Sequence, residues 1–440
     1  MNLLTDKIKT VYFKYLYAAF GSAMIVSIYS VVDMAIVGQY QGPSGTASLA
    51  VVAPIWNIIY SLGLLMGIGG SVIFSILRGN TKNQTKVSDE FFSASVFGAV
   101  LLSAVVWLLI LFFEKEILVF FGADDTLLYY AQKYMKPILF VVPLFLFNQM
   151  LAAFLRNDNN PSLATIGILA GGIFNIVGDY LFVFTFDMGI FGAGLATAIG
   201  SAISFFVLLT HFFSKKNTIK FVRPTEIFKK LKQICITGFS TFFIDIAMGI
   251  LTILFNRQIM RYLGADALAI YGPIINISTF VQCCAYSVGQ AAQPIISMNY
   301  GAKCVLRIKD VLKYSLYTVA FFSIFWTSLS LLCPNLYVKI FMTPTEHILK
   351  IAPEIIRTYS TSFMLLPLNI FATYYFQAIV RPKAAFIVSV LRGLILSGAL
   401  ILILPKLFGG SSILWAMPIT EVVVAILAII FMIRYTRKLA

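Results

Sequence analysis

The sequence predicts an all-α integral membrane protein in which twelve transmembrane helices form two pseudo-symmetric six-helix lobes. Three observations lead to this fold class. The 440 residues are 60% hydrophobic and 12% charged, with a mean hydropathy of +0.90. Long apolar runs recur along the chain, and its two halves repeat each other. Such a composition excludes a soluble globular protein of ordinary amino-acid usage.

The apolar runs supply the individual helices. Each is long enough to cross a hydrocarbon core of about 30 Å as a helix. We expect these helices at about 12–38, 47–77, 91–113, 134–155, 161–184, 189–213, 233–257, 267–298, 309–333, 354–379, 384–405 and 412–434.

The internal repeat divides the helices into two sets of six. LAVVAPIWNI begins at Leu49 and LAIYGPIINI begins at Leu268, an offset of 268 − 49 = 219 residues. Copies with six helices share one orientation, so an axis along the membrane normal should relate them. The longest and most basic connection lies between the sets. We therefore expect an N-lobe at 1–213, a cytoplasmic basic linker at 214–232 and a C-lobe at 233–440.

The net charge of +15 reflects topology. If both termini lie on one side, that side holds 23 of the 33 Lys and Arg residues, including Arg156 in a short loop, and one residue, Arg392, lies inside a span. The positive-inside rule then predicts a multi-pass plasma-membrane protein with both termini in the cytoplasm. We expect no nucleic-acid partner. Five cysteines and two histidines show no metal-binding spacing, and no nucleophile with a base is evident, so we expect no enzyme.

Four oxygen-bearing side chains are expected at one depth in the N-lobe. Asp33 lies in the first helix, Asn175 and Asp179 lie one turn apart in the fifth, and Thr197 lies in the sixth. All should lie roughly 7–14 Å below the outer surface. This set suits a small hard cation, either a shared proton or Na⁺, because two neighbouring carboxylates repel until a cation relieves them. Alternatively, Asp33 caps a helix kink and Asp179 faces water.

The order of several motifs resembles that of the multidrug and toxic compound extrusion (MATE) transporters, on their bacterial branch. The motifs are VDMAIVGQ from Val32, LRNDNNPS from Leu155 and NIVGDYLFVFTFDMGIFGAGLATAI from Asn175. The resemblance implies a secondary active antiporter that exports organic cations or amphipathic drugs in exchange for H⁺ or Na⁺. It also implies that Asp33, Asn175, Asp179 and Thr197 form the cation site. No cofactor other than the coupling ion is implied.

Two features depart from patterns in that family. Some members bend the first helix at a proline, whereas here bending would have to use Gly21 or Ser22, since no proline precedes Pro43. Some members also carry an aspartate in the tenth helix, where this chain has Asn369 and Gln377. We therefore expect no second cation site of that kind in the C-lobe.

The C-lobe has its own charged set inside the membrane. Asp245 lies midway along the seventh helix, Arg392 in the eleventh and Glu421 in the twelfth. If the repeat holds in space, the seventh and eleventh helices are neighbours, so we expect Asp245 to pair with Arg392. Glu421 is the competing partner. An ion pair would replace a titrating cluster here.

A central cavity between the lobes is the expected substrate site. Asp245 is the candidate for holding a cationic substrate if Arg392 does not neutralise it, and aromatic rings would add cation–π contact. Other candidate lining residues are Trp56, Asn57, Tyr60, Ser61, Asn276, Gln282 and Tyr286. Ordinary helix packing explains each of them individually just as well.

The nearest rival function is a flippase for a lipid-linked oligosaccharide or another amphipathic lipid. Such anionic cargo needs several inward-facing Arg or Lys residues, and only Arg392 qualifies on the sequence. A passive channel would need a continuous polar pore, and a scaffold would not need carboxylates at matched depth. We expect a monomer that alternates access to a small-molecule substrate across the bilayer.

Overall fold

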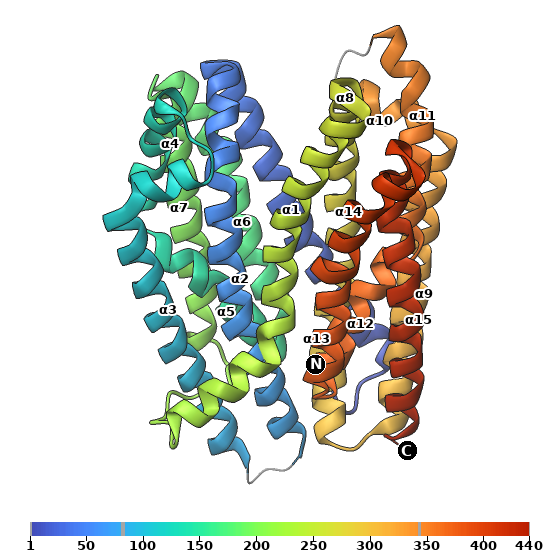
Figure 1. Ribbon diagram of the computed structural model, residues 1–440. Coiled ribbons are helices and arrows are strands. Elements are labelled where there is room, and N and C mark those ends of the chain that lie inside the picture. Colours follow the sequence, from blue (N-terminus) through green and yellow to red (C-terminus); the bar gives the residue numbers. More distant parts are fainter. Residues whose placement is uncertain (1, 81–83, 342–344, 440) are drawn as a thin grey trace.

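A computed structural model describes residues 2–80, 84–341 and 345–439 of this chain. Lys82, one of the 23 basic residues expected on the cytoplasmic side, lies outside the described residues. Helices account for nearly all of these residues, and none of them forms a strand. Figure 1 shows two helical bundles side by side, with both termini toward the same end. The all-α prediction is confirmed.

The first half of the chain forms seven α-helices and two short helices of other types. They are α1 (Ile8–Gln41), α2 (Pro43–Asn80), α3 (Thr85–Phe120), α4 (Asp125–Ile138), α5 (Val142–Asn157), α6 (Pro161–Tyr180), the π-helical turn η2 (Leu181–Thr185), α7 (Gly189–Leu209) and the 3₁₀ turn η3 (Thr210–Phe213). Proline starts α6, where its missing N–H costs nothing. Asp124 caps α4 by accepting a hydrogen bond from the Leu127 amide at 2.8 Å.

The second half continues from one very long helix. Its elements are α8 (Ile227–Gly301), α9 (Val305–Leu332), α10 (Pro334–Phe341), α11 (Glu346–Ser360), η4 (Thr361–Met364), α12 (Leu366–Ala378), α13 (Pro382–Val390), the π-helical turn η5 (Leu391–Ile395), α14 (Leu396–Phe408), η6 (Gly410–Trp415) and α15 (Ala416–Arg437). Gly264 interrupts α8 with φ 84° and ψ −176°, a conformation that glycine adopts without steric cost. Consequently α8 contains two membrane spans.

The predicted count of twelve spans is close to the observed one. Among the described residues, ten helices are long and apolar enough to cross a membrane, or eleven if α4 and α5, bent by 61° at their junction, form one span. The predicted tenth span, 354–379, falls on α11, η4 and α12. The matching breaks before Val142 and Leu366 are a further sign of the repeat.

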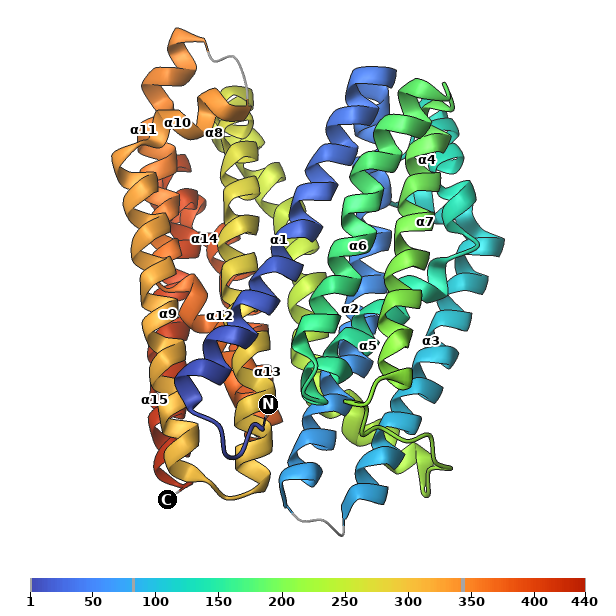
Figure 2. The ribbon, with the colours of Figure 1, turned by 180° about the vertical axis from the view of Figure 1, so that it is seen from behind.

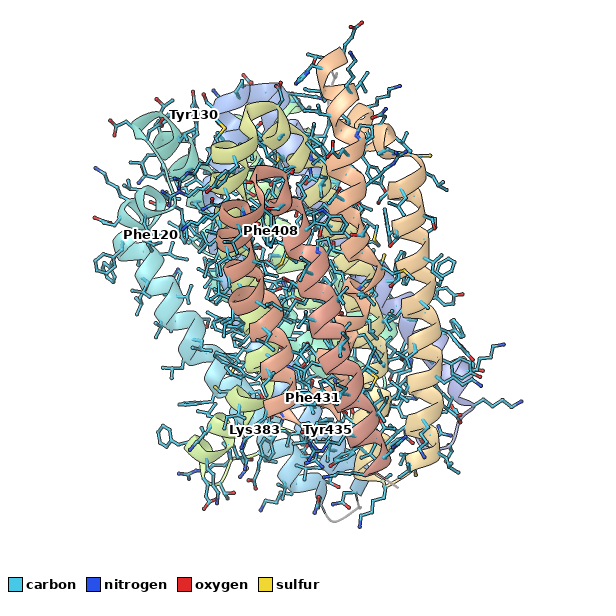
Figure 3. The ribbon with its side chains drawn as sticks, turned by 45° about the vertical axis from the view of Figure 1, so that its right-hand side comes forward. Phe120, Tyr130, Lys383, Phe408, Phe431 and Tyr435 are labelled. Carbon is cyan, nitrogen blue, oxygen red and sulfur yellow. The ribbon has the colours of Figure 1, made fainter. Side chains whose placement is uncertain are left out.

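Large apolar side chains cover the outside of the molecule. Phe120 is 83% exposed and Phe408 is 72% exposed, values that would be unfavourable in water. Figure 3 shows Phe120, Phe408 and Phe431 along the outer faces of the bundles, with Lys383 and Tyr435 toward one end. These surfaces face lipid, and the chain is a multi-pass membrane protein.

Helix α1 crosses from one bundle to the other (Figure 2). Its first half packs in an apolar core with the second bundle, where Tyr12 stacks on Tyr314 with ring centroids 6.2 Å apart. Its second half contributes Ile25 and Val37 to the core of α2–α7. Similarly, α8 begins against the first bundle, because Ile234 near its start packs in the core of α2–α7. The lobe boundaries at 213 and 233 stay a prediction. Helices α1 and α8 each pack in the cores of both bundles and so connect them.

Buried acids hold the basic linker against the first bundle. Asp158 accepts hydrogen bonds from the Thr218 amide (2.9 Å) and from Thr218 Oγ1, and it lies 2.7 Å from His211 Nε2. Asp89 accepts a hydrogen bond from the Lys220 amide at 3.2 Å. Glu90 contacts Lys230 at 2.8 Å. The linker is therefore anchored along the ends of α3, α5 and η3.

Candidate functional site: buried acids of the first bundle

Tyr134 connects two of the predicted oxygen-bearing residues. Its hydroxyl donates to Asp33 Oδ2 at 2.8 Å and lies 3.3 Å from Thr197 Oγ1. Asp33 comes from α1, Tyr134 from α4 and Thr197 from α7. All three side chains are buried. The network therefore ties α1, α4 and α7 together inside the first bundle.

Asn175 and Asp179 complete the set from α6. Asn175 Nδ2 donates to Thr197 Oγ1 at 3.0 Å. Asp179, one turn further along, is fully buried, and the π-helical turn η2 begins two residues later. Such turns are often found at functional sites. The structure thus brings Asp33, Asn175 and Thr197 into one hydrogen-bonded network, with Asp179 adjacent.

Four buried oxygens in this set have no hydrogen-bond partner. They are Asp33 Oδ1, Asn175 Oδ1 and both carboxylate oxygens of Asp179. The carboxylates of Asp33 and Asp179 lie close enough to repel each other, and neither forms an ion pair with a basic side chain in the described part of the chain. Buried acceptors without donors are costly, and oxygen donors suit hard cations. These residues fit a proton or Na⁺.

Glycines allow the helices that carry the set to approach closely. A Cβ on Gly171 of α6 would lie 2.3 Å from the Gly200 carbonyl oxygen of α7, near Asn175. A Cβ on Gly194 of α7 would lie 2.1 Å from the carbonyl oxygen of Tyr134. No side chain fits at such distances, so these contacts require glycine. They position Asn175 and Tyr134 within reach of Thr197.

In the second bundle, Arg392 pairs with Glu421. Arg392 Nε donates to Glu421 Oε1 at 2.8 Å, and the two side chains are 3% and 0% exposed. Asn369 Nδ2 donates to the other oxygen, Oε2, at 2.6 Å. The expected pairing of Asp245 with Arg392 is wrong, and the competing partner Glu421 is the one observed. Repeat symmetry predicts which helices are neighbours, but the π-helical turn η5, which contains Arg392, alters which face its side chain occupies.

Asp245 faces α2 and the second half of α8. Ser61 Oγ donates to Asp245 Oδ2 at 3.3 Å, and Tyr286 OH donates to Oδ1 at 3.5 Å. Both contacts are long, so the carboxylate is weakly bound. Tyr60 is close enough to feel its charge. Four predicted cavity residues, Asp245, Tyr60, Ser61 and Tyr286, therefore cluster where the bundles meet.

The other predicted lining residues do not join this cluster. Trp56 packs against Phe145 of the first bundle, with ring centroids 4.5 Å apart. Gln282 is buried and its Nε2 lies 3.4 Å from Ser278 Oγ, one turn away on the same helix. Asn57 and Asn276 are exposed, and neither side chain forms a hydrogen bond with Asp245. For Trp56 and Gln282, ordinary packing is the better interpretation.

Comparisons with known proteins show which family the chain belongs to. The MatE family model matches residues 18–181 and 241–403, most of the chain and once in each half. The chain belongs to the MatE family.

Relatives and solved structures of the MatE family match over nearly the whole chain. Multidrug export protein MepA of Staphylococcus saprophyticus is 26% identical, covering 94% of this chain and 91% of the relative. MepA of Staphylococcus haemolyticus is also 26% identical, covering 95% and 92%. These relatives are named as export proteins, not as enzymes.

Two solved structures show the same fold. One is the outward-facing conformation of a multidrug resistance MATE family transporter, with a TM-score of 0.90 at 18% identity, covering 99% of this chain and 98% of that one. The other is the MATE multidrug transporter DinF-BH, with a TM-score of 0.88 at 26% identity, covering 98% and 96%. The MatE fold predicted from the motifs is therefore confirmed.

Sequence reasoning missed two residues of this MatE chain. Tyr134 lies in the short helix α4, and only a count of hydroxyls at matched depth could have found it. Arg156 was expected in a cytoplasmic loop, but it is 6% exposed because α5 extends to Asn157. Its Nη2 donates to Ser22 Oγ at 3.2 Å, and Tyr15 OH donates to its carbonyl oxygen at 3.1 Å. Arg156 thus joins α5 to α1 at Ser22, one of the two residues that any bend in α1 would have to use.

Proposed function

We propose that this protein is a secondary active antiporter that exports organic cations or amphipathic drugs in exchange for H⁺ or Na⁺ by alternating access. Family membership supports transport, and the names of the MepA relatives and of DinF-BH support multidrug export. The observation that carries the ion coupling is the group of four unpartnered buried oxygens around Asp33 and Asp179.

The proposed coupling follows from repulsion between the two acids. Without a cation, the carboxylates of Asp33 on α1 and Asp179 on α6 disfavour a closed arrangement of these helices. A bound H⁺ or Na⁺ supplies the positive charge that removes this repulsion. A ligand can shift a conformational equilibrium only by its differential affinity for the two states. The set must therefore bind the cation more tightly in one access state than in the other.

Asp245 is the proposed contact for a cationic substrate. It lies where the bundles meet, and its two hydrogen bonds, at 3.3 and 3.5 Å, are weak enough for a cation to displace. The rings of Tyr60 and Tyr286 lie beside it and would add cation–π attraction. Arg392 does not compete for Asp245, because Glu421 neutralises it. The same pairing neutralises the one basic residue that the sequence offered to the anionic cargo of a flippase.

The proposed orientation places both termini in the cytoplasm of a cell whose plasma membrane holds the protein. The termini lie toward the same end of the bundles, as does the basic linker (Figure 1). This arrangement agrees with the distribution of Lys and Arg and the positive-inside rule. One chain carries both bundles, so we propose that the monomer is the transporting unit.

The test is dye efflux by the full-length protein reconstituted in liposomes, with a proton or a sodium gradient imposed separately. We expect wild type to export ethidium under one of the gradients. Asp33→Asn and Asp179→Asn should abolish gradient-driven efflux, because each removes a charge that the cation must neutralise. Asp310→Asn, the same chemical change at an exposed residue of α9, is the matched control and should leave efflux unchanged. Coupled efflux that survives both N-lobe substitutions would refute the proposed coupling site.

A further inference from the structure

A groove lies between the first half of α1 and the start of α6, on the outside of the molecule. Its volume is about 730 Å³, and it opens widely to the surroundings. The residues that line it include Lys9, Phe13, Lys14 and Tyr17 of α1, together with Ser162 and Ile166 of α6. Thr165 Oγ1 donates to the Ala18 carbonyl oxygen at 2.6 Å, which fastens the two helices together beside it. None of the proposed transport residues contributes to it.

The groove combines positive charge with exposed apolar side chains. Lys9 and Lys14 are exposed, and neither forms an ion pair within the described residues. No acidic side chain lines the groove. Tyr17 is 72% exposed and Ile166 is 54% exposed, and both would face lipid in a membrane. A ligand that complements this groove has an anionic head and an apolar body.

The position of the groove matches the depth of lipid headgroups. Lys9 lies one residue after the start of α1, and α1 crosses between the bundles from this end of the molecule (Figure 2). In the proposed orientation this end faces the cytoplasmic leaflet, whose anionic lipids attract basic residues. Aromatic side chains such as Tyr17 favour the same interfacial level.

We propose that this groove binds an anionic phospholipid. Its phosphate contacts Lys9 and Lys14, and an acyl chain lies against Phe13, Tyr17 and Ile166. Two ammonium groups disfavour a lipophilic cation, so the groove is not an entry route for the cationic substrates proposed above. The bound lipid lies against the half of α1 that packs on the second bundle, and against α6 of the first.

The test measures lipid binding to the delipidated full-length protein by native mass spectrometry. Phosphatidylglycerol and phosphatidylcholine with the same acyl chains are the two probes. We expect wild type to prefer phosphatidylglycerol. Lys9→Gln with Lys14→Gln should reduce that preference by roughly 30-fold, from about 1 kcal/mol for each Lys near an anionic surface at 1.4 kcal/mol per tenfold change. Lys215→Gln with Lys216→Gln removes the same charge from the exposed linker and should leave the preference unchanged.

A second measurement locates the acyl chain. Phe13→Trp places a fluorophore in the groove, and phosphatidylglycerol brominated along its acyl chain should quench the fluorescence added by that residue. Equal affinity for the two lipids would overturn the proposal, as would equal loss in the linker control. Quenching that ethidium reverses would show instead that the groove takes a lipophilic cation. Both measurements use binding alone, so they remain informative even if the protein transports no drug.

Discussion

Asp33 and Asp179 differ in how their oxygens are satisfied. Asp33 accepts one hydrogen bond from Tyr134 through Oδ2 and leaves Oδ1 free, whereas both oxygens of Asp179 are free. Tyr134 therefore fixes the orientation of one carboxylate, and Asp179 is held by its helix alone. A cation that bridges them would find one preorganised partner and one adaptable partner. The hydroxyl of Tyr134 should consequently matter for coupling while its ring matters for packing.

Tyr134→Phe tests this separation. The substitution keeps the buried ring and removes the donor to Asp33, a hydrogen bond to a charged group of roughly 1.5–3 kcal/mol. We expect gradient-driven ethidium efflux to fall by about tenfold or more, and thermal stability to fall by no more than the loss of this one hydrogen bond explains. Tyr129→Phe, on the same helix but 60% exposed, is the control. Unchanged efflux in Tyr134→Phe would show that Asp33 needs no donor.

The Arg392–Glu421 pair makes a prediction about stability. Removing one partner leaves a buried charge unpaired, which costs about 3–5 kcal/mol. We expect Arg392→Gln and Glu421→Gln each to lower the thermal stability of the purified protein strongly, and the double variant to be less destabilised than the sum. Lys229→Gln breaks an exposed pair with Glu226 and should change stability by less than about 1 kcal/mol. Additive effects of the two single substitutions would contradict the pairing.

At the scale of elements, close helix approaches build the site. Gly171 meets Gly200 between α6 and α7, and Gly194 meets the backbone of α4 beside Tyr134. The hydrogen bonds of Tyr134 and Asn175 to Thr197 depend on these approaches, because an ordinary side chain at either contact would push the helices apart. The site is thus a product of helix packing as much as of its polar residues.

Gly194→Ala tests the approach of α7 to α4. Its Cβ would lie 2.1 Å from the Tyr134 carbonyl oxygen, so α4 must move. We expect a loss of stability of about 1–3 kcal/mol and a fall in efflux at least as large as in Tyr134→Phe. Gly249→Ala is the matched control, since nothing lies within 4 Å of its added Cβ. Wild-type efflux in Gly194→Ala would show that α4 adjusts without losing the Tyr134 contact.

The sequence predicts where the helices lie, and how deep their residues sit in the membrane, better than it predicts which face of a helix a side chain occupies. The sequence predicted that Asp33, Asn175 and Thr197 lie together, because the depth of a residue in the membrane follows from its position along an apolar helix. The depth of Tyr134 could not be predicted in this way, since α4 is a short piece of a bent span. The partner of Arg392 was ambiguous for a related reason. The π-helical turn η5 changes the helical register, and its residues LRGLI carry no signal that predicts such a turn.

At the scale of the whole molecule, α1 connects the cation set to both bundles. The half with Asp33 packs against α6, and the half with Tyr12 packs against α9. Between them, Ser27 Oγ lies 2.9 Å from Cys283 Sγ in the second half of α8. If the bundles rock about a central cleft, the contact between α1 and α8 should open and close in each cycle. This contact supplies a direct test of the motion.

Ser27→Cys should form a disulfide with Cys283 on mild oxidation, because the two side-chain atoms are already in contact. We expect oxidation to stop efflux and a reductant to restore it, since the bond prevents α1 from leaving α8. Ser27→Cys combined with Cys283→Ala should be insensitive to oxidant, and mass spectrometry of linked peptides confirms the bond. Because Asp33 lies six residues from Ser27 on the same helix, the locked protein should still take up the coupling cation. Full transport by the cross-linked protein would contradict this motion. It would show that α1 and the second half of α8 move together during the cycle.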